Sequence, residues 1–284
     1  MNRHSLTRQA GKIALSALGV LIALVWAFPV YWMLVSAVTP NARLRAVTPT
    51  FFPDHFTTRS FARLLGSGSS FWPALRMSLT VTSVAVVVVL VCAFFGALAV
   101  SRFQFRGRKG FILSVLFIQM LPAEGLFIAQ YRLLANAGML NRVGGIAILY
   151  AAAIIPFTVW MLRGFVAGVP AELEEAAMVD GLTRTQAFRR VTLPLLAPGL
   201  VASGVYAFLQ AWNEFTIALV ALPANSSNTL PLWLRGFMTA SVARGVDWAQ
   251  VMAASTLITV PVIILFLVVH HHMTAGVVSG AVKG

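Results

Sequence analysis

The chain has 284 residues, of which 59% are hydrophobic and only 10% are charged. A soluble domain carries about a quarter of its residues as charged ones. This composition excludes a soluble globular protein and a disordered chain, and it favours an integral membrane protein. The formal net charge of +13 would suggest nucleic-acid binding in a soluble protein. Here the basic residues lie between apolar runs, where they meet lipid headgroups.

Six apolar runs follow one another along the chain, and each is long enough to cross a hydrocarbon core of about 30 Å as a helix. We expect helices at about 13–38, 73–100, 111–129, 143–162, 195–222 and 251–269. The predicted fold class is therefore an all-α membrane protein of about six transmembrane helices. Residues 1–12 form an N-terminal segment before the six-helix domain (13–269), and residues 270–284 form a C-terminal tail.

The basic residues predict which side of the membrane each loop faces. Residues 101–110 form a tight turn that contains Arg102, Arg106, Arg108 and Lys109 and no acidic residue. Short loops rich in Lys and Arg face the cytoplasm. With six helices, this places both termini in the cytoplasm.

The sequence offers little for a metal ion or a disulfide. Cys92 is the only cysteine, so neither a disulfide framework nor a cysteine metal site can form within one chain. The consecutive residues His270, His271 and His272 do not share one helix face, and we interpret them as a polar cluster where a helix leaves the membrane. We therefore assign no metal-binding, catalytic or cofactor-binding residues.

The segment between the fourth and fifth runs, residues 163–194, leaves the membrane and is expected to form a helix–turn–helix. Glu172 and the acids beside it suit the positive end of a first helix. Gly181 can adopt the left-handed conformation that ends a helix. A second short helix is expected over 183–190, and Pro194 then marks the return to the membrane.

This segment resembles the signature loop of ABC importer permeases. The family pattern is Glu-Ala-Ala, three residues, Gly, nine residues, then a β-branched residue, any residue and Leu-Pro. This chain matches the pattern without a gap, with Val191 where Ile is commonest. The resemblance implies that the segment is a cytoplasmic coupling helix, which contacts a separate ATPase through Glu175, Ala176, Ala177, Asp180, Gly181, Val191, Leu193 and Pro194. We expect Ala176 and Ala177 to lie against the ATPase.

Two looser matches extend the resemblance over most of the chain. Trp212–Phe215 and the ending Ala275–Gly284 look like the corresponding stretches of carbohydrate permeases of the maltose-importer class, and they are similar to the smaller, six-helix partner of that permease pair. The resemblance implies an ABC type I importer permease fold and a location in the bacterial inner membrane. It also implies a tail that reaches the ATPases through Gly276, Gly280 and Lys283.

The resemblance further implies a pump of several chains. These are a second permease, two ATPases that bind ATP and Mg, and an extracytoplasmic solute-binding protein that delivers a sugar. This chain lacks the G-x-x-x-x-G-K-[ST] loop, so we expect a transport subunit without its own ATPase site. Two alternatives are an ABC permease for glycerol phosphate or another polyol-like solute, and an ion-coupled secondary transporter, although no internal repeat is evident.

Three polar residues within the apolar runs are candidates for lining the transport pathway. Asn213 and Glu214 lie in the fifth run, and Glu124 lies near the outer end of the third. A carboxylate in hydrocarbon costs several kcal/mol unless it is paired, neutralised or faces a wet cavity. Glu214 and Asn213 either line the pathway, serve as structural partners to another helix or lie near the outer headgroups, and these interpretations stay open. For Glu124, which lies closer to water, the structural role is favoured.

Overall fold

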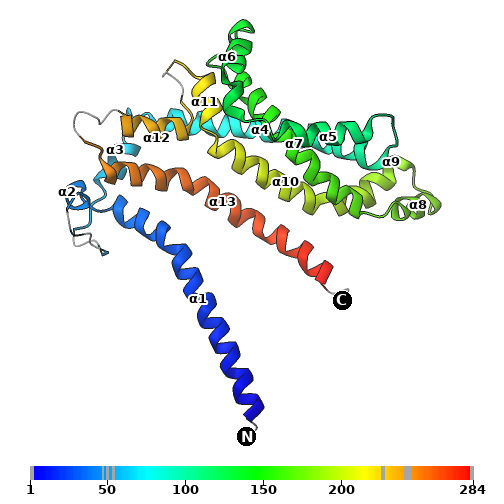
Figure 1. The fold of residues 1–284 in the computed structure, drawn as a ribbon, viewed down its shortest axis with the longest axis horizontal. Coiled ribbons are helices and arrows are strands. Elements are labelled where there is room, and N and C mark those ends of the chain that lie inside the picture. Colours follow the sequence, from blue (N-terminus) through cyan, green and yellow to red (C-terminus); the bar gives the residue numbers. More distant parts are fainter. Residues whose placement is uncertain are drawn as a thin grey trace. The chain divides into compact units, whose positions relative to one another are not determined.

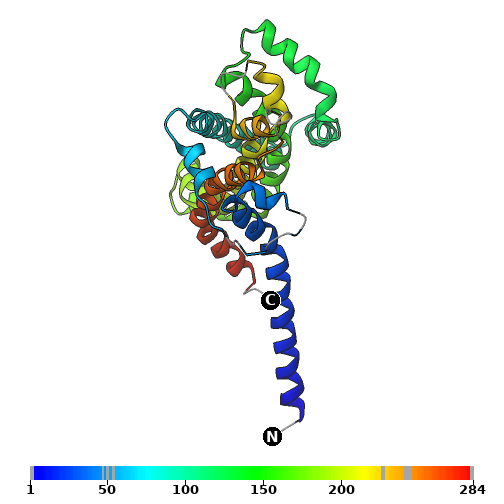
Figure 2. The ribbon, with the colours of Figure 1, turned by 90° about the vertical axis from the view of Figure 1, so that its left-hand side faces the viewer.

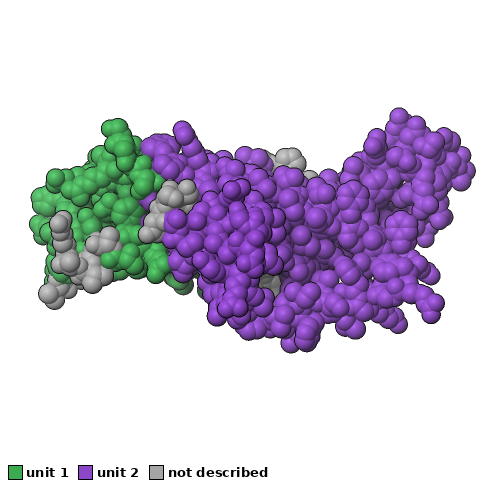
Figure 3. Space-filling view, turned by 90° about the horizontal axis from the view of Figure 1, so that it is seen from above, with its two compact units in different colours: residues 1–70, 234–260 green, residues 71–233, 261–284 purple. Residues whose placement is uncertain are grey.

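A computed structural model of the chain describes residues 3–46, 48, 51–52, 55–224, 228–239 and 245–281. These residues form helices and turns, with no strand among them. They divide into two compact units, residues 1–70 with 234–260 and residues 71–233 with 261–284 (Figure 3). In the described part of the chain, five helices are long and apolar enough to cross a membrane: Lys12–Ala37, Phe71–Arg102, Val143–Gly168, Arg184–Asn213 and Trp248–His270.

The first unit consists of α1 (Arg3–Ala37), two short helices, α2 (Asn41–Leu44) and α3 (Arg59–Leu65), and the beginning of α13. The helix α1 is continuous in both views (Figure 1, Figure 2), and its side chains are exposed over residues 12–31. Polar contacts join the short helices to the start of α13. Oδ1 of Asn41 accepts a hydrogen bond from the backbone N–H of Trp248 at 3.0 Å. Nη1 of Arg63 lies 3.8 Å from Oδ2 of Asp247.

The second unit is built on three long helices, α4 (Phe71–Arg102), α7 (Val143–Gly168) and α10 (Leu193–Asn213), which pack along one another (Figure 1). On α4, the residues Val81, Ala85, Val89, Ala93 and Ala97 recur every four positions, and all five are fully buried. A spacing of four places them on one helix face. Helices in lipid associate through close packing of small side chains, so this stripe explains why α4 lies at the centre of the unit.

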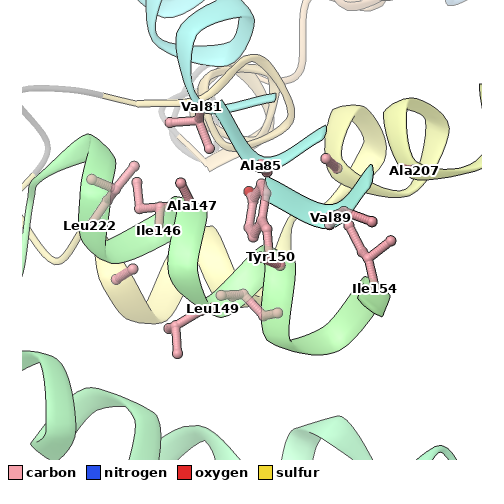
Figure 4. Close-up of a cluster of buried hydrophobic side chains, with 14 of the residues drawn as sticks. Val81, Ala85, Val89, Ile146, Ala147, Leu149, Tyr150, Ile154, Ala207 and Leu222 are labelled. Carbon is pink, nitrogen blue, oxygen red and sulfur yellow. The ribbon is translucent and has the colours of Figure 1, made fainter. Parts of the chain in front are cut away.

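Tyr150 of α7 fills the middle of this core. Figure 4 shows its ring beside Ala85 and Val89 of α4, with Ile154 one turn further along α7. The side chain is only 1% exposed. Its hydroxyl donates a hydrogen bond to the backbone carbonyl of Glu214 at 3.3 Å, and this contact ties the core of the unit to the end of α10.

The structure corrects the third predicted helix, because residues 111–129 do not form one continuous helix. They are divided among α5 (Arg108–Ile118), the 3₁₀ helix η1 (Ala123–Leu126) and the start of α6 (Phe127–Asn136). Pro122 lies in the break, and proline cannot donate the hydrogen bond that a continuing helix needs. The 11 residues of α5 rise only about 16 Å, roughly half of the hydrocarbon core.

The fifth predicted helix, residues 195–222, is also divided. It begins as α10, which ends at Asn213, and it resumes as the short helix α11 (Thr216–Ala221). The break falls at Glu214 and Phe215.

Helices also extend into two segments that lie outside the six predicted transmembrane helices. The helix α12 (Leu230–Thr239) lies in the predicted loop between the last two runs. The last helix, α13 (Trp248–Ala281), does not stop at residue 269. Residues 270–281 contain no proline, and they prolong the helix instead of forming a separate tail.

Candidate functional site

The family pattern lies in a compact helix–turn–helix at the end of α7, and we call residues 171–194 the EAA segment. Its first helix, α8 (Glu172–Val179), has Glu172, Glu174 and Glu175 in its first turn, where negative charge is favourable. Gly181 ends this helix with φ of +93°, as the sequence predicted. The backbone N–H groups of Gly181 and Leu182 donate to the carbonyls of Met178 and Ala177 at 3.1 Å each, so the last turn of α8 is closed by hydrogen bonds.

The second half of the EAA segment is continuous with α10. Its helix α9 (Arg184–Ala187) begins with a capping box, in which Thr183 and Gln186 each accept a backbone N–H of the other. The π-helix η2 (Phe188–Thr192) follows, and α10 begins directly at Leu193. Pro194 is the second residue of α10. The segment expected to end near Arg190 is therefore the first part of a longer helical rod.

A hydrogen bond between side chains joins the two halves of the EAA segment. The Thr192 hydroxyl, which is 1% exposed, donates to Oε2 of Glu174 at 2.9 Å. Because Glu174 lies on α8 and Thr192 lies at the end of η2, this bond fixes α8 against the base of α10. The sequence analysis did not single out either residue, since neither is a defined position of the family pattern.

The structure places the two alanines of the pattern on different sides of α8. Ala176 is exposed, but Ala177 is only 8% exposed and is buried within this chain. Its own chain therefore covers most of the Ala177 side chain, and the contact of Ala177 with an ATPase stays a prediction. The remaining pattern residues lie on the surface or are half-buried: Glu175, Asp180, Gly181 and Pro194 are exposed, and Val191 and Leu193 are half-buried.

The EAA segment is also attached to the end of α4. Arg102 donates through Nη2 to the carbonyl of Val169 at 2.9 Å, and Val169 is the residue that caps the end of α7. Beyond this contact, a groove of about 650 Å³ separates the end of α4 from α8, with Arg102, Phe103, Glu174 and Glu175 among its lining residues. The α8 helix therefore has one face on its own chain and the rest of its surface open.

Glu214, the second candidate, lies between α10 and α11. Its Oε1 accepts hydrogen bonds from the backbone N–H groups of Thr216 at 2.9 Å and Ile217 at 2.8 Å, and its Oε2 accepts one from Ala218 at 3.1 Å. The first N–H groups of a helix have no partner within the helix. Glu214 supplies those partners for α11, and this explains the break in the fifth run. A structural partner was one of the roles left open for it.

Removing this cap is expected to destabilise the chain. Glu214→Leu leaves three N–H groups of α11 without their acceptor, and loss of a helix cap costs about 1–2 kcal/mol. Glu214→Gln keeps one acceptor oxygen and is expected to lower the melting temperature of the purified chain in detergent less than Glu214→Leu. A transport pathway that needed the charge itself would give the opposite pattern, with Gln as harmful to uptake as Leu and no change in melting temperature.

The other candidates are spread over the chain. Asn213 is exposed at the last residue of α10, and its amide Nδ2 donates to the carbonyl of Leu209 at 2.8 Å. Glu124 belongs to η1, and its side chain lies outside the described part of the structure. Gly276 and Gly280 belong to the backbone of α13, and Lys283 lies outside the described residues.

Comparison with known families settles the class of protein. Residues 90–278 match the family described as "Binding-protein-dependent transport system inner membrane component", and this range includes the whole EAA segment. The chain belongs to this family. The resemblance stated from the sequence is thereby confirmed, and so is the membrane permease fold class.

Relatives of this inner membrane component are similar to it over almost their whole length. The diacetylchitobiose uptake system permease protein DasC of Streptomyces coelicolor is 43% identical over 274 residues, which cover 96% of this chain and 98% of that protein. The trehalose/maltose transport system permease protein MalG of Thermococcus litoralis is 29% identical and covers 96% of this chain and 97% of its own length.

A solved structure has the same fold. A chain of a bacterial ABC transporter involved in the import of the acidic polysaccharide alginate superposes with a TM-score of 0.73, covering 95% of this inner membrane component and 98% of that chain. The sequence identity is 24%, so this likeness supports the fold.

Proposed function

We propose that this chain is one of two permease subunits of an ATP-driven, binding-protein-dependent sugar importer, in which it forms half of the translocation pore. The observation that carries the proposal is the EAA segment, where a closed helix–turn–helix presents Glu175, Ala176 and Asp180 on an exposed surface and continues without a break into α10. Such a segment can receive a movement on α8 and pass it to a membrane helix.

The sugar class is supported by the relatives. Both DasC, with 43% identity, and MalG, with 29%, are named for the uptake of small oligosaccharides. We propose that the substrate is a disaccharide or short oligosaccharide, and N,N′-diacetylchitobiose is the first compound to test because the relative with the higher identity is named for it.

The proposed pump contains chains other than this one. We propose a second permease, two ATPase subunits that bind ATP and Mg, and an extracytoplasmic solute-binding protein. A chain of an alginate ABC transporter that was solved in complex with an alginate-bound periplasmic protein has a TM-score of 0.65 with this chain, which supports the fold needed for such an assembly. We assign the ATPase site to a separate chain and propose that this subunit has no cofactor of its own.

Both termini are proposed to face the cytoplasm, and cysteine labelling can test this orientation. In a Cys92→Ala background, a membrane-impermeant maleimide added to intact cells is expected to label Ser67→Cys and to leave Ser279→Cys unlabelled until the cells are opened. Ser67 is preferred to its neighbour Gly68, whose φ of +86° would strain any other side chain. Labelling of the tail from outside, or protection of Ser67→Cys, would reverse the proposed orientation.

The function itself is tested by reconstitution. We expect proteoliposomes that hold this chain, its partner permease and the ATPase, with the binding protein outside, to take up labelled diacetylchitobiose only when ATP is inside. Gly181→Val is the matched inactive variant, because a β-branched residue resists the φ of +93° at the turn of the EAA segment. Uptake that follows an ion gradient without ATP would instead establish a secondary transporter.

A further inference from the structure

Three aromatic rings form a continuous row across α7 and α10. Phe157 of α7 lies 5.7 Å from Trp160 of the same helix and 4.6 Å from Tyr206 of α10, measured between ring centroids. Trp160 is 46% exposed, and the other two rings are half-buried. The row therefore begins at the surface of α7 and crosses to α10.

Two amide side chains extend this row along α10. Gln210 donates through Nε2 to the Tyr206 hydroxyl at 3.3 Å, and Asn213 lies one turn further on. Residues 206, 210 and 213 share one face of a helix, because their spacings of four and three residues each correspond to about one turn. Both amides are exposed. We call these five residues, Trp160, Phe157, Tyr206, Gln210 and Asn213, the aromatic–amide face.

This face is unsuited to lipid. Gln210 and Asn213 lie in the last turn of α10, which belongs to a helix long and apolar enough to span the membrane, and both residues are exposed. An amide that meets hydrocarbon without a hydrogen-bond partner is costly, so such groups normally face other protein or a wet cavity. Asn213 donates through Nδ2 to the carbonyl of Leu209, and the residue as a whole is exposed.

Glu214 does not belong to this surface. Its two carboxylate oxygens accept three backbone N–H groups of α11, so the carboxylate next to Asn213 is already engaged. The five residues of the aromatic–amide face carry no charge. They offer flat apolar rings together with neutral hydrogen-bond donors and acceptors, a combination that suits a neutral, hydroxyl-rich molecule and not an ion.

We propose that the aromatic–amide face is a carbohydrate-binding surface of the transport pathway, along which Trp160, Phe157 and Tyr206 stack on the apolar faces of sugar rings while Gln210 and Asn213 hydrogen-bond their hydroxyls. This inference rests on the proposed function, since it assigns the surface on this subunit that its sugar touches. Asn213 keeps the pathway role suggested by the sequence, and Glu214 becomes a positioning residue that holds α11 beside the face.

The test compares sugar movement with ATP consumption. Gln210→Leu and Asn213→Leu are reconstituted with the partner permease, the ATPase and saturating binding protein loaded with labelled diacetylchitobiose. Loss of a hydrogen bond to the sugar is expected to lower uptake by about threefold to tenfold in each variant. The stimulation of ATP hydrolysis by the loaded binding protein should stay at the level of the unchanged protein, so fewer sugars are moved for each ATP hydrolysed.

A matched control and a conservative variant complete the design. Asn136→Leu makes the same change at an exposed amide of α6, outside the face, and should leave the ratio of sugar to ATP unchanged. Trp160→Ala should lower that ratio, and Trp160→Phe should restore most of it because a ring is still present.

Three outcomes are distinguishable. Normal ratios of sugar to ATP in Gln210→Leu, Asn213→Leu and Trp160→Ala would overturn the proposal. Loss of the partner permease during purification of these variants would also overturn it, because the face would then be a contact between helices of the two subunits. If the unchanged protein transports no sugar with ATP, the proposed function is overturned, and the carbohydrate-binding role of the face is overturned with it.

Discussion

Ala177→Asp is expected to abolish ATP-driven sugar uptake while the chain still inserts into the membrane. Ala177 is the buried residue of α8, with 8% of its surface exposed, and it lies where α8 packs against α9 and η2. A carboxylate at this position is buried without a partner, which costs several kcal/mol. The new charge would also lie near the negative end of α8, where it is further disfavoured.

The neighbouring alanine separates a packing defect from a defect of docking. Ala176→Asp introduces the same charge one residue earlier, at an exposed position on the same helix. We expect Ala177→Asp to lower both the melting temperature of the purified chain and the amount of ATPase that co-purifies with it. Ala176→Asp should lower only the co-purified ATPase. An Ala177→Asp chain that keeps both its stability and its ATPase would show that this packing is not needed for coupling.

Gly199→Ala is expected to destabilise the packing of α10 against α7. A Cβ at Gly199 would lie 2.5 Å from Cγ and 2.8 Å from Cβ of Phe165 on α7. These atoms are close to the backbone of Phe165, so the ring cannot simply rotate away and the two helices must move apart. Overpacking of this kind costs about 1–3 kcal/mol, more than the roughly 1 kcal/mol that alanine gains over glycine in a helix.

Gly204→Ala provides the control on the same helix. A Cβ there would meet Leu90 Cδ1 at 3.5 Å, which is an ordinary contact. We therefore expect Gly204→Ala to leave the melting temperature in detergent unchanged or slightly raised, and Gly199→Ala to lower it clearly. Equal melting temperatures for the two variants would mean that α7 and α10 do not approach each other as closely as the structure describes.

The sequence was informative where the signal was long or specific. Apolar runs predicted α1, α4, α7 and α13, and the spacing of the EAA pattern predicted a helix, a left-handed Gly181 and a second helix. Both signals arise within short stretches of the chain. A long apolar run indicates a helix that can cross the membrane, and a glycine marks a position where the backbone can adopt a positive φ.

The sequence was less informative where side chains decide between local alternatives. From the sequence, Glu214 is an acidic residue within an apolar run, which fits either a helix cap or a pathway residue. The structure shows that its carboxylate accepts the first N–H groups of α11, as a helix cap does. Ala177 was correctly placed on a helix, but which side of α8 is covered depends on the tertiary packing. Pro122 lies within the third run, but the sequence does not show whether neighbouring helices satisfy the backbone groups that a proline leaves free.

The rod formed by α9, η2 and α10 has a mechanical consequence. Residues Arg184–Asn213 form 30 residues of uninterrupted helical structure, which corresponds to a length of roughly 45 Å. One end of this rod follows the glycine turn at Gly181, and the bond from Thr192 to Glu174 clamps α8 to it partway along. A tilt of about 5° at the clamp would therefore displace a point 30 Å along α10 by about 3 Å, because a stiff lever multiplies a small angle by its length. A slight tilt of α8 would thus displace α10 at the level of Asn213 far enough to admit or exclude a hydroxyl group.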